Sequence, residues 1–431
     1  MATVVSAAEF RDMIDAARRG ERSFAVVDTR PADSFAGWRI AGSTNYFYKP
    51  FHEFDRDDFE TETGVGPDET VVLTCAKGKA SFDLGEELAA AGYGDVYVID
   101  DGMRGWSAVY DHAQIPLPDD ELDTLDIVQV QRRAKGCLGY LVVGGRADPD
   151  RTSIGDALDT TDPDARVAVA VDVSRHGEEW QAAADAHDAE IAAVLDTHVH
   201  ADHLSGGRAL ADELAVPYYL PAAAAARDVA HAFEPIERNE VLDVGGVDLK
   251  ALATPGHTDD MASYLVGRSA VLTGDTLFVD SVGRTELQFA AVADADGRAD
   301  AEDDTAAAQT GAQQLYDSLH GTLLAEPDDV VVLPGHFSVA NDGTTGDVTP
   351  GEPVATTVGE ARTSIDVLDR NRESFVERIT ATLPAKPPNY TSVIAANRGV
   401  ESPPDEVTAI ELELGPNRCA AAITPEREAD D

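Results

Sequence analysis

Short apolar segments alternate with helical patterns over the first part of the chain, up to about residue 112. Each apolar run is short and continuous, which is typical of a strand that is buried on both faces. We expect strands at 23–28, 70–75 and 95–100, and helices at 6–19, 80–91 and 103–110. This alternation predicts a small α/β domain over residues 1–114.

The pattern changes after residue 114. Residues 115–124 are rich in Pro and Asp and show no periodicity, so we expect a linker there. Over residues 125–431 several strands follow one another before each helix, which predicts sheets packed between helices. The later elements that we expect are strands at 247–253, 262–266 and 270–273 and a helix near 312–324. Residues 290–309 are acidic and poor in large apolar side chains, which predicts a solvated insertion loop.

The large excess of acidic residues argues against some classes of binding partner. The chain has 33 Lys and Arg residues against 80 Asp and Glu residues, a formal net charge of -47 at pH 7. Nucleic-acid binding needs Lys and Arg to displace counterions from phosphates, so we expect no nucleic-acid partner. The hydrophobic fraction of 43% still supports a folded core, and the acids are spread from end to end. We interpret the many acidic residues as an adaptation to the salt-rich cytoplasm of a halophile, where salt near 1 M screens charges over about 3 Å.

The sequence also predicts where the protein is located and what role its cysteines have. The N-terminal residues lack a basic flank followed by an apolar stretch, and no run approaches the roughly 20 apolar residues of a membrane span. We therefore expect a cytoplasmic protein with no membrane partner. The chain has 3 cysteines, an odd number that argues against a disulfide framework. Cys137 and Cys419 have no cationic loop or helix start nearby, and we expect them to pack in the core.

Histidine is concentrated at one point of the chain. Of the 11 histidines, His198, His200 and His203 lie close together, with Asp202 among them, directly after the apolar run 191–195. These residues are expected at a strand end that opens into a turn. Asp202 is also a candidate N-cap for the helix that follows.

Three later turns repeat this arrangement. Gly-His at 256–257, Gly-Asp at 274–275 and Gly-His at 335–336 each follow a strand-like run, as expected if several strand ends converge. A single residue of this kind is more often a turn or capping group. A cluster of this size instead predicts a metal centre, because imidazole and carboxylate together bind zinc, iron or manganese.

These motifs resemble those of the metallo-β-lactamase superfamily, and the resemblance covers roughly residues 125–398. It implies an αββα sandwich with the metal site at one edge of the two sheets. In the hydrolytic, glyoxalase II-like branch, a metal-activated hydroxide attacks a thioester. That branch implies two sets of ligands joined by a bridging Asp275: His198, His200 and His257 for one ion, and Asp202, His203 and His336 for the other.

A further set of residues resembles the persulfide dioxygenase family. The set comprises Gly-Arg-Thr-Glu at 283–286, a helix with Leu315, Tyr316 and His320, and Asn-Arg-Gly at 397–399. Two other segments, Gly-Asp-Thr-Leu-Phe at 274–278 and Leu-Pro-Gly-His at 333–336, are closer to the glyoxalase II form. The dioxygenase is therefore the preferred interpretation and the hydrolase the alternative.

The dioxygenase resemblance implies one ferrous ion held by two His and one Asp. The corresponding residues here are His198, His257 and Asp275. Such a set leaves coordination positions open for a substrate sulfur and O₂. The remaining motif residues would orient these ligands or hold a second metal, namely His200, Asp202, His203 and His336.

A different motif surrounds Cys75. This residue ends an apolar run and is followed by Ala-Lys-Gly-Lys-Ala-Ser and a predicted helix. Backbone N–H groups in such a loop and a helix N-terminus both favour the thiolate. Two of the six lysines in the chain, Lys77 and Lys79, lie in this loop. A cysteine at a strand end is ordinarily structural, but the glycine and the two cations favour a nucleophile.

Over residues 1–112 the chain resembles a rhodanese domain. The resemblance rests on the Cys75 loop, Val-Asp-Thr-Arg at 27–30, Trp-Arg-Ile-Ala-Gly-Ser-Thr-Asn at 38–45 and Asp-Gly-Met-Arg-Gly-Trp at 101–106. It implies that Cys75 carries a sulfane sulfur as a persulfide. Lys77 and Lys79 would then stabilise the sulfur anion.

Together the two resemblances predict an Fe(II)-dependent persulfide dioxygenase fused to a rhodanese sulfurtransferase. The substrates would be a low-molecular-weight thiol persulfide and O₂, and Cys75 would exchange sulfane sulfur with a donor or acceptor. Arg284 is a candidate for binding the anionic part of the substrate. The alternative is a glyoxalase II-like thioester hydrolase with one or two zinc ions and an accessory rhodanese domain. A homodimer is left open.

Overall fold

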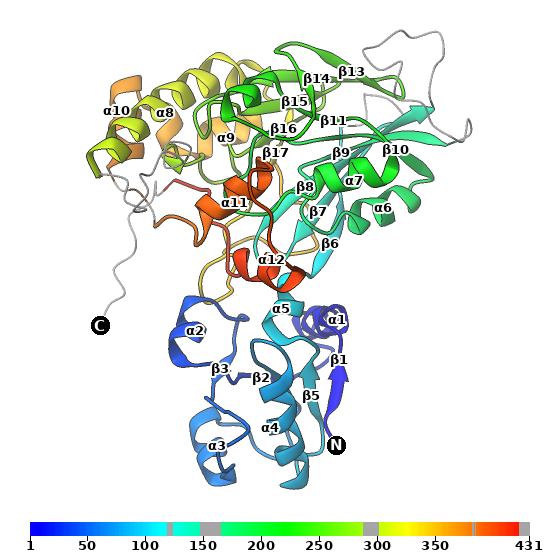
Figure 1. Ribbon diagram of the computed structural model, residues 1–431, viewed down its shortest axis with the longest axis vertical. Helices are drawn as coiled ribbons and strands as arrows, with labels where there is room; N and C mark the ends of the chain where they lie inside the picture. The colour runs from blue at the N-terminus through cyan, green and yellow to red at the C-terminus, as the bar shows by residue number, and fades with distance from the viewer. Residues whose placement is uncertain (119–123, 147–164, 288–300, 382, 384, 422–431) are drawn as a thin grey trace.

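The computed structural model describes residues 1–118, 124–146, 165–287, 301–381, 383 and 385–421. Two units lie one above the other along the long axis of the molecule (Figure 1). The smaller unit contains the N-terminal residues, and the larger unit contains the two remaining sheets with their helices.

The smaller unit is a five-stranded parallel sheet with helices packed on it. The strand order is β1 (Thr3–Val5), β5 (Val96–Ile99), β4 (Val71–Thr74), β2 (Ala25–Asp28) and β3 (Thr44–Asn45). The helices are α1 (Ala7–Arg18), α2 (Ala32–Gly37), α3 (Arg56–Thr63), α4 (Lys79–Ala90) and α5 (Gly102–Ser107). One apolar cluster contains Phe10 of α1, and another contains Phe59 of α3 and Leu84 of α4. The central strand β4 is therefore buried along its whole length.

The larger unit contains two sheets that pack face to face. The first sheet has the order β12 (Glu234–Ile236), β11 (Tyr218–Pro221), β10 (Ala189–Leu195), β9 (Arg166–Val171), β8 (Cys137–Arg146), β7 (Asp126–Arg132) and β6 (Tyr110–Gln114). The second has the order β13 (Val241–Val244), β14 (Val247–Ala253), β15 (Ala262–Val266), β16 (Ala270–Gly274), β17 (Val331–Pro334) and β18 (Thr356–Thr357). Side chains from both sheets form one core, including Val142 and Leu195 from the first and Tyr264 and Leu272 from the second.

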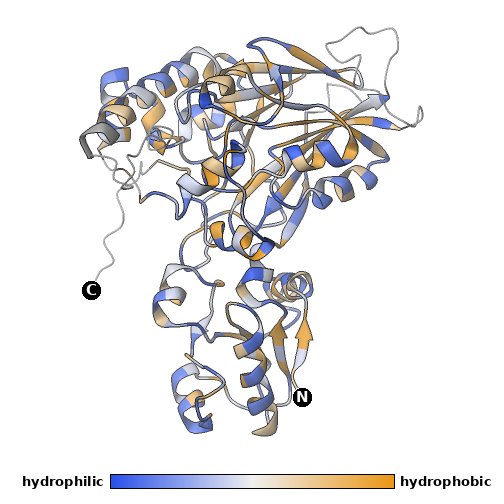
Figure 2. Cartoon of the chain, in the orientation of Figure 1, coloured by the Kyte–Doolittle hydropathy of each residue, from blue (hydrophilic) through white to orange (hydrophobic). Residues whose placement is uncertain are grey.

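Helices cover the outer faces of both sheets. On the first sheet lie α6 (Glu178–Asp185) and α7 (Gly207–Leu214), and on the second lie α8 (Ala301–Gly321), α9 (Val358–Ser364) and α10 (Arg372–Thr380). Two further helices follow, α11 (Tyr390–Asn397) and α12 (Glu406–Leu412). Apolar residues are frequent along the strands, and polar residues are frequent on the helices (Figure 2). The predicted αββα arrangement is thus confirmed.

The structure differs from the sequence predictions at the boundary between the units. Residues 110–114, expected in the first domain, form β6, which pairs antiparallel with β7 of the larger unit. Pairing continues at Ile115, whose N–H donates to the Ile127 carbonyl oxygen at 2.9 Å, so the expected linker begins inside the sheet. The boundary therefore lies near residue 109. Residues 119–123 of the expected linker lie outside the described residues.

The structure also differs in part from the solvated loop that we expect at the acidic insertion. Residues 301–309 were expected in a loop but form the first turns of α8. This segment is rich in alanine, and the high helix propensity of alanine outweighs the acidic composition. Residues 290–300 lie outside the described residues.

A C-terminal segment, residues 406–421, joins the two units, and we call it the strap. It begins with α12, which lies between α5 and the larger unit (Figure 1). Glu411 of the strap pairs with Arg104 of α5. Farther along, the carbonyl oxygen of Cys419 accepts a hydrogen bond from the Arg284 N–H at 2.9 Å. The strap thus runs from the smaller unit to the segment that follows β16.

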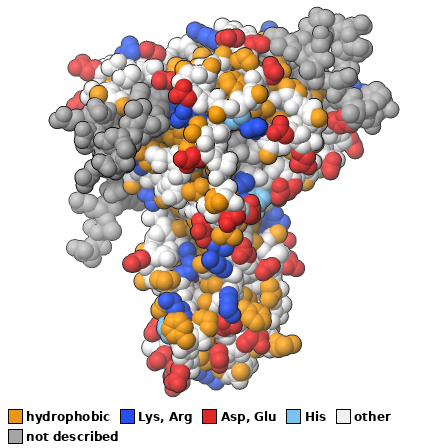
Figure 3. Space-filling view, in the orientation of Figure 1, with side chains coloured by type: hydrophobic (Ala, Val, Ile, Leu, Met, Phe, Trp, Pro, Cys, Tyr) orange, Lys and Arg blue, Asp and Glu red, His pale blue; other side chains and the backbone are white. Residues whose placement is uncertain are grey.

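The surface agrees with the distribution of charge in the sequence. Asp and Glu side chains are scattered over this face of both units rather than gathered in one patch (Figure 3). Among the described residues there is no helix with the length and apolar character needed to cross a membrane.

Candidate metal centre

The predicted metal ligands follow the ends of strands from both sheets. His198, His200 and His203 lie in the turn after β10, Asp275 follows β16, and His336 follows β17. All five side chains are buried. The strand ends therefore converge as the sequence predicts.

Three ligand atoms approach one another without forming hydrogen bonds. Asp275 Oδ2 is 4.0 Å from His198 Nε2 and 3.4 Å from His257 Nε2, and the three atoms form one group of possible ligands. All three atoms are buried, and none has a hydrogen-bond partner among the described residues. Leaving a buried polar atom without a hydrogen-bond partner costs about 1–3 kcal/mol of stability. A bound cation would remove this cost, so the arrangement fits a metal site. The two separations suit ligands that each lie about 2 Å from a shared ion.

Two backbone features place His257 and Asp275. Nδ1 of His257 donates to the carbonyl oxygen of Arg284 at 2.8 Å, so the lone pair is on Nε2, which faces the site. Gly274, at φ +48, precedes Asp275 in a crowded turn. A Cβ at this position would lie 2.8 Å from Thr197 Oγ1, so only glycine permits this approach.

A chain of hydrogen bonds orients His198. Its Nδ1 lies 2.9 Å from Thr197 Oγ1, which in turn donates to the carboxylate of Asp172 at 3.0 Å. Asp172 also accepts from the Thr197 N–H at 2.7 Å and lies 3.1 Å from His200 Nε2. Burial lowers the pKa of His198 well below its usual value. The neutral ring then keeps a lone pair on Nε2 for a cation.

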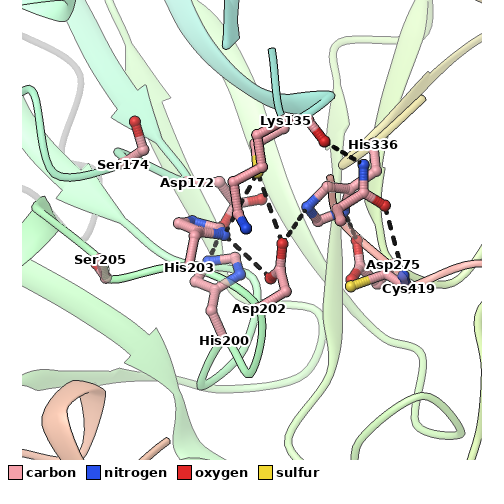
Figure 4. Close-up of polar contacts among 12 residues, drawn as sticks. Lys135, Asp172, Ser174, His200, Asp202, His203, Ser205, Asp275, His336 and Cys419 are labelled. Atoms are coloured by element: carbon pink, nitrogen blue, oxygen red, sulfur yellow. Dashed lines mark hydrogen bonds and ion pairs between the residues drawn. The ribbon is translucent and has the colours of Figure 1, made fainter. Parts of the chain in front are cut away.

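A second group of ligands lies beside the first. His336 lies between two carboxylates (Figure 4), 2.6 Å from Asp275 through Nδ1 and 2.9 Å from Asp202 through Nε2. His203 Nδ1 is 3.1 Å from the other oxygen of Asp202. Burial opposes ionisation of Asp275, but the charge and hydrogen bond of His336 outweigh it and hold the pKa of Asp275 far below its usual range. In contrast to the first group, most of these atoms satisfy one another.

The smaller unit places Cys75 at a second candidate site. Cys75 follows β4 and lines a hollow of about 300 Å³. Its side chain is buried, and Ser81 Oγ lies 3.3 Å from its sulfur. The Cys75 carbonyl oxygen accepts from the Met103 N–H at 2.7 Å. Gly102, at φ +55, approaches so closely that a Cβ there would lie 2.1 Å from the same oxygen.

Comparison with known families covers the segments that carry both candidate sites. Residues 6–109 match the rhodanese-like domain, and residues 168–336 match the metallo-beta-lactamase superfamily. The chain belongs to the metallo-β-lactamase superfamily and carries a rhodanese-like domain.

The individual relatives of this chain are described as different enzymes. A Schizosaccharomyces pombe protein described as a probable hydroxyacylglutathione hydrolase, glo2, is 29% identical over 190 residues, which is 43% of this chain and 60% of that protein. The mitochondrial persulfide dioxygenase ETHE1 of Bos taurus is 24% identical over 273 residues, 63% of this chain and 87% of that protein. The crystal structure of ETHE1 from Myxococcus xanthus has a TM-score of 0.44 and 26% identity, and the match covers 63% of this chain and 97% of that one.

Two cysteines lie close to the second group of ligands in the metallo-β-lactamase domain. Cys137 Sγ is 3.6 Å from an oxygen of Asp202 and 3.9 Å from His203 Nδ1. Cys419 is one of four residues whose ligand atoms lie within 4.8 Å of one another, the others being Asp202, Asp275 and His336. Both cysteines are buried as expected, and the structure adds that each lies beside predicted metal ligands. No spacing in the sequence relates them to the histidine motifs, because the contacts are entirely long-range.

Distant residues also hold the histidine turn. The Asn397 side chain donates to the carbonyl oxygens of His200 at 2.9 Å and His203 at 2.8 Å. The Asn-Arg-Gly segment that the sequence singles out therefore supports the turn directly. Asp202 is not the N-cap of the next helix, because α7 begins at Gly207 with Gly206 as its N-cap. Its carboxylate contacts His203 and His336 instead.

The two lysines of the Cys75 loop differ in their surroundings. Both are exposed, and Lys79 Nζ lies 3.3 Å from Asp83 one turn along α4, so its charge is shared with a carboxylate. Lys77 has no ion pair with any residue that the structure describes. Lys49 joins both lysines in lining the hollow beside Cys75, so three of the six lysines gather there. The role of Lys77 and Lys79 in stabilising a sulfur anion stays a prediction.

Arg284 lies inside the fold rather than on an open surface. Its side chain is 1% exposed. The guanidinium contacts Glu286 at 2.7 Å and the carbonyl oxygens of Ala385 and Arg418, each at 3.0 Å. These contacts are typical of a structural ion pair and disfavour the predicted contact with substrate. The backbone carbonyl of Arg284 acts on the site instead, through His257.

Proposed function

We propose that this chain is an Fe(II)-dependent persulfide dioxygenase that oxidises a low-molecular-weight thiol persulfide to sulfite, and that its rhodanese-like domain is a sulfurtransferase. The observation that carries the proposal is the contrast between the two groups of ligands. His198, His257 and Asp275 direct three unpartnered atoms at one point, whereas His336 already bonds to both neighbouring carboxylates. This contrast favours one ion held by two His and one Asp.

The relatives support the same choice. The Bos taurus relative is named as a persulfide dioxygenase, and the match covers 87% of its length. The match with the Schizosaccharomyces pombe protein covers 60% of that relative. A persulfide dioxygenase is also consistent with a rhodanese-like domain in the same chain, because both would handle sulfane sulfur.

The proposed reaction is RSSH + O₂ + H₂O → RSH + SO₃²⁻ + 2 H⁺. Iron bound at the first group would supply the redox chemistry. The chain itself supplies orientation: Asp172 fixes His198 through Thr197, and the Arg284 carbonyl fixes His257. His336 occupies one oxygen of Asp275, which leaves the other to face the site. Burial of these side chains limits the access of water to the reacting sulfur.

The rhodanese-like domain would act on the product. A persulfide on Cys75 has a terminal sulfur that the sulfur lone pair of sulfite can attack. The new S–S bond forms thiosulfate, the S–S bond to Cys75 breaks, and the Cys75 thiolate leaves. The reverse step loads Cys75 from thiosulfate. The thiol that carries the persulfide, the direction of transfer, a cytoplasmic location, salt adaptation and a homodimer stay predictions.

A zinc-dependent thioester hydrolase is the second candidate. It is favoured by Nδ1 of His200 and Nε2 of His203, which are also buried without a partner among the described residues. In the hydrolytic arrangement, His200 would bind the first ion with His198 and His257, and His203 would bind a second ion. The Schizosaccharomyces pombe relative carries a hydrolase name.

Parallel assays on one preparation separate the two candidates. We expect O₂ uptake when glutathione persulfide is added and no cleavage of a hydroxyacylglutathione thioester. The variant His257→Ala should lose O₂ uptake while remaining folded by circular dichroism. Thioester cleavage without O₂ uptake would instead establish the hydrolase.

A further inference from the structure

A hollow of about 290 Å³ lies between the two domains, and we call it the interdomain cleft. Arg30, Lys77 and Arg104 line it from the rhodanese-like domain. Leu414 and Arg418 of the strap line it from the other side. A ligand in this cleft would therefore contact both domains at once.

The charge of the cleft is opposite to that of the chain as a whole. Its lining contains four basic side chains and one acidic side chain, that of Glu411, although acids outnumber bases 80 to 33 in the sequence. Arg30 pairs with Asp28, and Arg104 pairs with Glu411.

The other two cations, Lys77 and Arg418, have no ion pair with any described residue. Arg418 is half-buried, and its Nη2 contacts only a neutral group, Asn341 Oδ1, at 3.3 Å. Two cations from different domains thus line one hollow without a direct ion pair, although Glu411 lines it as well and Asp101 lies near enough to Lys77 to feel its charge. In a chain of this composition, such a pair favours an anionic ligand.

The cleft also touches the immediate neighbours of both candidate centres. Ala76 and Lys77 line it, and they directly follow Cys75. Arg418 lines it, and the next residue is Cys419, whose sulfur lies in the second group of metal-centre ligands. Consecutive Cα atoms are only about 3.8 Å apart. Ala76 on one wall of the cleft is therefore the direct neighbour of Cys75, and Arg418 on the other wall is the direct neighbour of Cys419.

The cleft and the Cys75 hollow share an edge. Arg30, Ala76 and Lys77 line both of them. The two hollows therefore adjoin at these three residues, beside Cys75.

We propose that the interdomain cleft binds a small divalent sulfur oxyanion, sulfite or thiosulfate, held between Lys77 and Arg418. The choice of a sulfur oxyanion rests on the proposed function, since sulfite is the product of one centre and thiosulfate the product or donor at the other. The volume lies at the lower end of the range for small-ligand pockets, which suits a hydrated oxyanion better than a nucleotide-sized ligand. Binding in the cleft is non-covalent.

The test measures binding without either reaction. The full-length Cys75→Ser chain, which cannot accept sulfane sulfur, is titrated with thiosulfate and with sulfite by calorimetry under anaerobic conditions. We expect saturable binding of one anion per chain. Adding Arg418→Gln should weaken it by about 10-fold or more, the loss expected for a charged hydrogen bond.

Two further variants make the result specific. Arg372→Gln removes the same charge at an exposed residue that pairs with Asp317, and it should bind as the parent does. Arg418→Lys keeps the charge and should bind more tightly than Arg418→Gln, provided that both unfold at the parent temperature. Binding that is absent, or equal in Arg418→Gln and Arg372→Gln, overturns the proposal.

The same design separates this proposal from the proposed function. Anion binding needs neither iron nor O₂, so a chain that fails to oxidise persulfides can still show the Arg418-dependent site. In that case the cleft is supported and the dioxygenase is not. If O₂ uptake is found and the titration shows no Arg418 dependence, the cleft is refuted alone.

Discussion

Glu413 offers a sharp test of how the strap supports the histidine turn. Its carboxylate lies 3.0 Å from Arg132 and 3.0 Å from Arg175, and it accepts a hydrogen bond from the Leu204 N–H at 2.8 Å. The residue is 1% exposed. Leu204 directly follows His203, so the carboxylate ties the strap to the turn that carries His198, His200 and His203. We predict that Glu413→Gln destabilises the fold, because the two arginines lose a buried anion.

The size of the effect can be estimated from the pKa. Burial opposes ionisation of Glu413, but Arg132 outweighs it, and the pKa falls from 4.5 to about 2. A shift of that size corresponds to about 3 kcal/mol of stability. Because the folded pKa is lowered, this stability is fully present above pH 4.5 and is lost as the pH falls toward about 2.

Thermal unfolding at pH 7 in concentrated salt measures the prediction. A loss of about 3 kcal/mol should lower the midpoint by about 6–12 °C for a domain of this size. Glu406→Gln is the matched control, because Glu406 also pairs with Arg175 but its side chain is 69% exposed. Exposed pairs contribute only about 0–1 kcal/mol, so its midpoint should hardly change. Equal effects of the two variants, or a Glu413→Gln effect that persists unchanged below pH 4.5, would refute the reasoning.

Five other variants test the two centres. Cys75→Ser should abolish thiosulfate:cyanide sulfurtransferase activity and leave persulfide-dependent O₂ uptake unchanged; retained transfer would exclude Cys75 as the carrier. Lys77→Gln should slow transfer more than Lys79→Gln, whose charge is already shared with a carboxylate, and the reverse order in steady-state rates would contradict this. Asp172→Asn should weaken iron binding by about 10–100-fold in competition with a chelator, and unchanged affinity would remove its orienting role. Asp202→Asn should keep the parent iron content by elemental analysis, because the first group of ligands is intact, and complete loss of iron would argue against a single-ion site.

The parts of the fold that follow from local patterns are predictable from the sequence. The strand that directly precedes Cys75 lies where its apolar run predicts, and α4 begins directly after the loop. The candidate ligands His198, His257 and Asp275 can also be picked out from the sequence, because each stands in a short motif after an apolar strand, and the structure brings their ligand atoms together. In each of these cases, the residues that decide the structure are neighbours along the chain.

Contacts between distant segments are not predictable in this way. Cys419 lies beside the candidate metal centre because the strap contacts both domains. No motif in the sequence around Cys419 predicts this position. Asp202 matches the local rule for an N-cap, but its contact with His336 decides its position. β6 has the sequence Tyr-Asp-His-Ala-Gln, which has little strand character of its own, and it forms because it pairs with β7. In all three cases, a contact between distant segments outweighs the structural preference of the local sequence.

Iron content and O₂ consumption, measured together on one anaerobically purified and iron-reconstituted preparation, test the central claim most directly. The proposed function predicts about one iron per chain, in the arrangement of two His and one Asp, and one O₂ consumed for each persulfide oxidised. His257→Ala should lose both the iron and the O₂ uptake. Two zinc ions per chain that cannot be replaced by iron, with no O₂ uptake on a persulfide, would contradict it.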